Sequence, residues 1–143
     1  MKRSSRLDNL AGINQHFENQ AGSSFADAQV QLQKQEHQLQ LLINYRNEYN
    51  QQLTEKMKTT SSAFEIREFQ QFIATIDAAI SQQQEQVQKF VAELQNREQE
   101  WLQKRHEVKK LSRAAEVVRQ REATIDQRAE RKEEDELGAK VTS

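Results

Sequence analysis

The side chains of this sequence that most often do chemistry are spread thinly along it. Its three histidines, His16, His37 and His106, are far apart and have no partner at the spacing of metal ligands. Its acidic residues are mixed with basic ones, as on a solvated helix surface, where nothing raises the pKa of a carboxyl group for acid–base work. There is no cysteine, which excludes disulfides and thiolate chemistry. We therefore expect no catalytic pair, no metal site and no cofactor.

Phosphate recognition is also poorly supported. The sequence has no glycine-rich phosphate loop and no nucleophile elbow. Basic residues gather between Lys104 and Arg113, but Glu107 lies among them and the formal net charge of the chain is −1, which favours a solvated face. No run of about 18 apolar residues exists to cross a membrane. The sequence thus predicts neither nucleic-acid binding nor a transmembrane helix, and without a concave site an enzyme is the least favoured class.

One set of residues could instead bind a protein partner. Two groups of four share the spacing four, three, four, which places each group in one stripe of a helix. These groups are Gln38, Leu42, Tyr45 and Tyr49, and Phe72, Ile76, Ala79 and Gln83. Tyrosine suits a docking surface because it has an apolar body and a polar end. The same residues could equally widen a local core, and residue types alone leave both interpretations open.

Helices must position these residues. Apolar residues make up 35% and charged residues 30% of the 143-residue chain, which contains no proline and only three glycines. Turns draw on glycine and proline, so the chain has few of them. The apolar content suffices for a thin seam between two long helices, where two or three positions in seven must be buried. The composition therefore predicts an all-α protein.

The second half of the chain carries the clearest periodicity. Apolar residues follow one another at alternating steps of three and four over about nine heptads, which is typical of a coiled coil. They are Ile66, Phe69, Ile73, Ile76, Ile80, Val87, Phe90, Leu94, Trp101, Val108, Leu111, Ala115, Val118, Ile125 and Ala129. Four polar residues interrupt this seam and can fix its register, namely Gln83, Arg97, Lys104 and Glu122.

The first half has a looser apolar stripe when read at roughly 100° per residue. It consists of Phe25, Ala28, Leu32, Leu39, Ile43, Leu53 and Met57, with Arg46 and Asn50 as polar interruptions. Upstream, Gly12 and Gly22 each cost about 1 kcal/mol relative to alanine in a helix interior. We therefore expect the first helix to fray or break before about Ser23.

A polar stretch at residues 58–62 separates the two halves. Ser62 and Glu65 have the spacing of a capping box, which marks the start of the second helix. A short connection between two long helices makes them antiparallel neighbours. The prediction is a long antiparallel two-helix coiled coil at residues 23–130 with its loop at 58–62. A frayed helical extension precedes it at 1–22, and a charged, disordered tail follows at 131–143.

Two stretches near the loop resemble the flagellar FliJ family. They read LLINYRNEY at residues 41–49 and EFQQFI at 68–73, and the distinctive residues lie between about 38 and 94. The resemblance implies an antiparallel two-helix coiled coil that looks like the rotor stalk of rotary ATP synthases. It implies a component of the flagellar type III export apparatus, in the cytoplasm and peripherally associated with the inner membrane.

The resemblance also implies partners. They are the hexameric export ATPase FliI, the export-gate protein FlhA and the export substrate chaperones. The end of the hairpin that carries the termini would enter the central pore of FliI, and the chain would promote assembly of the FliI ring. The family's gate-binding surface maps onto the eight residues from Gln38 to Gln83 singled out above; leucine is common where Ile76 stands, and histidine where Gln83 stands. The alternative is a generic or homodimeric coiled-coil scaffold, although a passive spacer has little reason to keep polar seam residues that lower its stability.

Overall fold

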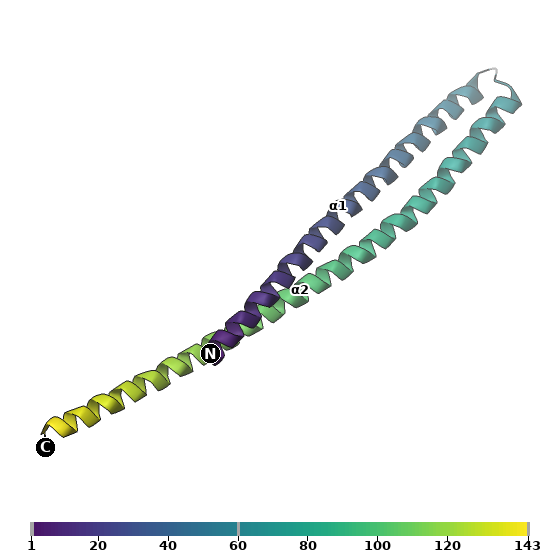
Figure 1. Cartoon of the computed structure of the whole chain (residues 1–143). Helices are drawn as coiled ribbons and strands as arrows, with labels where there is room; N and C mark the ends of the chain where they lie inside the picture. The colour runs from purple at the N-terminus through teal and green to yellow at the C-terminus, as the bar shows by residue number, and fades with distance from the viewer. Residues whose placement is uncertain (1, 60, 143) are drawn as a thin grey trace. The chain divides into compact units, whose positions relative to one another are not determined.

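The chain folds into two long helices joined by a short turn. The computed structural model describes residues 2–59 and 61–142. Helix α1 runs Arg3–Lys58 and helix α2 runs Ala63–Thr142, and they pack against each other as an antiparallel hairpin (Figure 1). The predicted all-α hairpin is confirmed. Within the described residues, neither helix contains a stretch long and apolar enough to cross a membrane.

The hairpin consists of two compact units. The tip unit is Gly22–Gln99 and contains the turn; the terminal unit combines Met1–Ala21 with Glu100–Ser143. In the turn, the Ser62 hydroxyl accepts a hydrogen bond from the backbone N–H of Glu65 at 3.2 Å, which is the serine half of the expected cap. The Glu65 carboxylate lies 3.9 Å from the Lys56 ammonium, so it ties the two helices together across the turn. Thr60, in the predicted loop, lies outside the described residues.

The seam of the tip unit is tightest on α2. Ile73, Ile76 and Ile80 are 9%, 6% and 4% exposed, whereas the residues they face are half-buried. On α1 the seam passes through Leu39, Leu42, Arg46, Tyr49, Leu53 and Lys56. The residues expected from the sequence differ, because Asn50 and Met57 are exposed. The physical reason is the period: a coiled coil keeps 3.5 residues per turn, and a stripe drawn at 3.6 drifts away from it.

The terminal unit has a thinner core made of small side chains. Ala115 is 1% exposed, Ser4 5% and Ala11 9%. Helix α1 runs without a break from Arg3, where the sequence predicted fraying or a break before Ser23. Contacts with α2 along this stretch offset the cost of Gly12, whose Cβ position points into open space.

Two features at the far end of α2 differ from what the sequence predicted. Ile125 is 63% exposed and Ala129 is exposed, so the seam does not include them. It ends at Glu122, because Glu122 bonds Ser4 in the first turn of α1 and little of α1 remains to face the residues beyond. The residues that follow continue as a helix to Thr142, where disorder was expected, and those up to Lys140 are exposed. Alanine, glutamate, lysine and arginine all favour a helix. The domain boundaries proposed from the sequence stay a prediction.

Candidate partner-binding surface

The eight candidate residues lie together on one side of the tip unit. In the heptad register, Leu42, Tyr49, Ile76 and Gln83 belong to the seam itself. Gln38, Tyr45, Phe72 and Ala79 occupy the position just before a seam residue on each helix. In an antiparallel pair these flanking positions face each other along one edge of the seam. We call the eight residues the tip surface.

An aromatic cluster joins the two helices at the centre of the tip surface. The Tyr49 ring centroid lies 4.6 Å from that of Phe72 and 5.1 Å from that of Tyr45, both in tilted arrangements. The ring centroid of a third neighbour, Phe69, lies 6.0 Å from that of Tyr49, and the Lys56 ammonium lies 4.7 Å from the Phe69 centroid. These separations are those of favourable aromatic pairs. Tyr49 therefore contacts both Tyr45 on its own helix and Phe72 on the other helix.

The members of the tip surface are exposed to very different degrees. Tyr45 is 48% and Phe72 43% exposed, and Gln38 is also exposed. Leu42, Tyr49 and Ala79 are half-buried, while Ile76 is only 6% exposed. The core interpretation therefore applies to the inner members, whereas docking of a partner by the outer members stays a prediction. The outer residues are available to a partner, and the inner ones form the core that supports them.

Gln83 has a role within the seam. Its side-chain nitrogen donates to the backbone carbonyl of Gln35 at 3.0 Å and to the Gln35 side-chain oxygen at 2.8 Å. This pair of bonds fixes the register of α1 against α2 about three turns from the aromatic cluster. Sequence reasoning missed Gln35. Gln35 lies three residues after Leu32 and four before Leu39, and this heptad spacing is the signal that could have identified it as a seam residue.

The electrostatics of the tip surface are simple. None of its eight residues carries a formal charge. A hydrogen bond with Tyr45 raises the pKa of the Tyr49 hydroxyl, so Tyr49 stays neutral at physiological pH. The cross-helix ion pair between Arg46 and Asp77, at 3.6 Å, involves the opposite edge of the seam. The surface therefore offers a neutral apolar face with hydroxyl and amide groups at its margin.

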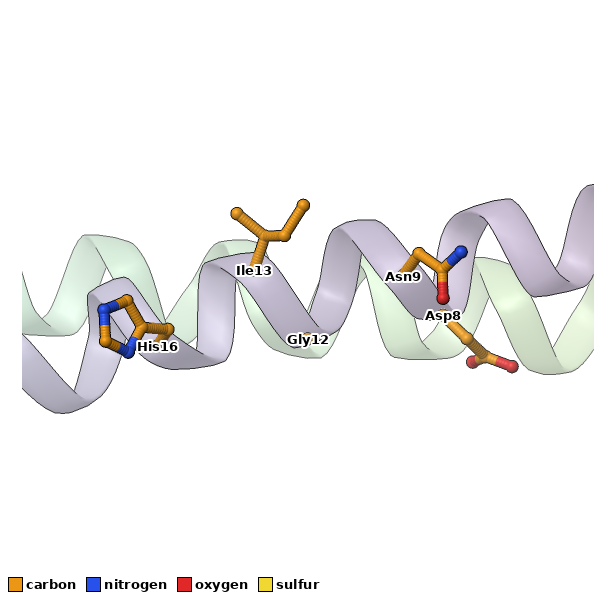
Figure 2. Close-up of a pocket in the computed structure, with 5 residues that line it drawn as sticks. All are labelled: Asp8, Asn9, Gly12, Ile13 and His16. Carbon is orange, nitrogen blue, oxygen red and sulfur yellow. The ribbon is translucent and has the colours of Figure 1, made fainter.

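The other residues considered from the sequence do not converge on a chemical site. A shallow hollow on α1 is lined by Asp8, Asn9, Gly12, Ile13 and His16, and Figure 2 shows Ile13 pointing outward and His16 apart from Asp8. Asp8 is already bonded to Arg119 at 2.6 Å. Among the described residues, no group of three or more histidine, aspartate or glutamate side chains is placed to hold a metal ion.

The basic run is partly committed to contacts within the terminal unit. Lys104 lies 3.6 Å from the Glu107 carboxylate and 5.8 Å from the Phe17 ring centroid. Arg105 lies over the Trp101 ring at 5.4 Å, and Trp101 is half-buried at its expected seam position.

Comparison with known proteins agrees with the resemblance noted from the residues. The model of a family described as "Flagellar FliJ protein" matches residues 2–142. The "Flagellar FliJ protein" of Escherichia coli (strain K12) is 27% identical over 113 residues, which cover 76% of this chain and 74% of that protein. No solved structure matches the chain. Because the family match spans almost the whole hairpin, the chain belongs to the FliJ family and is a component of flagellar protein export.

Proposed function

We propose that the chain docks the export-gate protein FlhA through the tip surface and couples this gate to the export ATPase FliI. The observation that carries the proposal is that two exposed aromatic rings from different helices, Tyr45 and Phe72, each pack against Tyr49. Paired exposed aromatics with a polar rim are typical of the centre of a protein interface. The role is binding, and no step of it requires catalysis by this chain.

The core beneath the tip surface supports the same proposal. Ile73, Ile76 and Ile80 are the most buried residues of the tip unit and lie beside or just below the aromatic cluster. A packed base holds Tyr45 and Phe72 in place before a partner arrives. Less side-chain entropy is then lost on binding, so more of the contact energy appears as affinity.

The gate proposal can be tested with purified FlhA and the full chain by a direct binding assay. Tyr45→Ala with Phe72→Ala should weaken binding at least about tenfold, since each truncation removes an exposed aromatic anchor. The matched control is Leu41→Ala with Phe64→Ala, which removes side chains that are 53% and 64% exposed in the same unit but lie off the tip surface. The control should bind within about twofold of the unchanged chain.

Thermal melts accompany both variants, and both should keep the melting temperature of the unchanged chain. Equal binding by the aromatic variant and the control would refute the gate proposal. Loss of folding in the aromatic variant would instead show that Tyr45 and Phe72 belong to the core.

The coupling half of the proposal concerns the terminal unit. This unit exposes Leu10, Ile13 and Phe17 to 48%, 54% and 46%, which gives a partner apolar side chains to contact. We propose that this end enters the FliI ring and promotes ring assembly, and that the chain also assists the export substrate chaperones. ATP hydrolysis by purified FliI should rise saturably with added chain, and Ile13→Ser with Phe17→Ser should reduce the rise. An unchanged hydrolysis rate at every concentration would count against coupling.

A further inference from the structure

The outer face of α2 in the terminal unit carries two arginines that the fold leaves unused. The side chains of Arg121 and Arg128 make no ion pair or hydrogen bond with any other residue that the structure describes. Four carboxylates in this unit are already engaged. Arg119 bonds Asp8 and Glu116, each at 2.6 Å, the Ser4 hydroxyl donates to Glu122 at 2.6 Å, and Lys2 bonds Asp126 at 3.1 Å.

Exposed apolar side chains share this face with the two arginines. Val117 is 49% and Ile125 63% exposed, and Thr124 lines the same hollow. Together with Arg121 and Arg128 these residues line one shallow hollow, at the steps of four, three, one and three that keep residues on a single helix face. We call these five residues the arginine face. It combines aliphatic area with two uncommitted guanidinium groups, which bind carboxylates bidentately.

One member of the arginine face, Ile125, continues the row of the existing seam, and the other four lie beside that row. Ile125 follows Val118 and Glu122 at the heptad step, yet it is exposed because α1 begins at Arg3 and leaves it uncovered. Elsewhere the same row of α2 is covered by a helix. A second helix is thus the form of occupant that this position accepts.

We propose that the arginine face docks a helical segment of a partner protein that carries aspartate or glutamate next to aliphatic residues. The aliphatic residues pack on Val117 and Ile125, and the carboxylates accept hydrogen bonds from Arg121 and Arg128. A second copy of this chain is a poorer occupant. Beyond Ile125 the seam row offers only Ala129 before charged residues, so self-pairing would bury far less area than the roughly 1,200 Å² of a stable interface. The proposal does not depend on what the tip surface binds.

The test uses the full chain and a labelled synthetic helical peptide about five turns long, with leucines along one face and glutamates beside them. Fluorescence anisotropy measures its binding. Arg121→Gln with Arg128→Gln should lower the affinity at least about tenfold, and so should Val117→Ser with Ile125→Ser. The matched control, Lys109→Gln with Arg113→Gln, removes the same charge from exposed positions of the same helix and should change the affinity less than about threefold.

A twin peptide with glutamine in place of glutamate should bind as weakly as the arginine variant does. Equal losses in the arginine variant and in the control would overturn the proposal in favour of diffuse charge attraction. Equal binding of the two peptides would overturn it because carboxylates are then not recognised. If the unchanged chain sediments as a dimer and the variant Arg121→Gln with Arg128→Gln sediments as a monomer, a second copy of the chain occupies the arginine face, and the proposal is wrong. If duplex DNA displaces the peptide from the unchanged chain, and DNA binding is lost in the same arginine variant, the arginine face binds nucleic acid instead.

Discussion

Two isoleucines at heptad positions of α2 provide a sharp test of where the seam lies. The sequence places both Ile80 and Ile125 on the seam, but they are 4% and 63% exposed. Replacing isoleucine with alanine removes three carbon groups, worth about 0.8 kcal/mol each when buried. At Ile80 nearly the whole of this is lost, about 2.4 kcal/mol, and the residual cavity brings the cost to about 2–4 kcal/mol.

At Ile125 the same substitution should cost little. Only about a third of the side chain is shielded from water, which corresponds to roughly 0.8 kcal/mol, and the better helix propensity of alanine offsets about half of that. Urea titrations followed by circular dichroism at the helix band measure both free energies of unfolding. In thermal melts, Ile80→Ala should lower the melting temperature by on the order of 10 °C and Ile125→Ala by about 1–2 °C. Equal losses at the two sites would refute the assigned end of the seam.

Two further predictions concern polar residues that the helices share. Hydrogen bonds from the Ser4 hydroxyl and backbone lower the pKa of Glu122, so its stabilising effect is present above the ordinary pKa of glutamate and is lost as the pH falls through the lowered value. As the pH is lowered into the acid range, the melting temperature should therefore fall less steeply for Glu122→Gln than for the unchanged chain. Parallel plots of melting temperature against pH would contradict this role. Gln83→Leu should raise the melting temperature, because an apolar residue replaces a polar one in the seam while Gln35 stays accessible to water. A lower melting temperature would mean that the Gln35 bonds outweigh apolar burial.

The residues of the aromatic cluster show what the sequence could and could not predict about the candidate surface. Spacing alone places Tyr45 and Tyr49 on one stripe and Phe72 on another, because helix geometry fixes which residues share a face. It also predicts that both stripes lie near the turn. It does not tell which residues are outermost: Tyr45 and Tyr49 share one stripe off the predicted seam, yet Tyr45 is 48% exposed and Tyr49 is half-buried. That difference arises only when the second helix covers one of them.

The amino-acid sequence by itself determined two antiparallel helices, the turn between them and most of the seam on α2. These features follow from local propensity, a serine cap and a heptad period, all of which act within a few residues along the chain. The tertiary structure decided what depends on the opposite helix: the Gln35–Gln83 bonds, the end of the seam at Glu122 and the uncommitted state of Arg121 and Arg128. Each of these depends on which residues face one another across the pair, and that register is a property of two helices in contact.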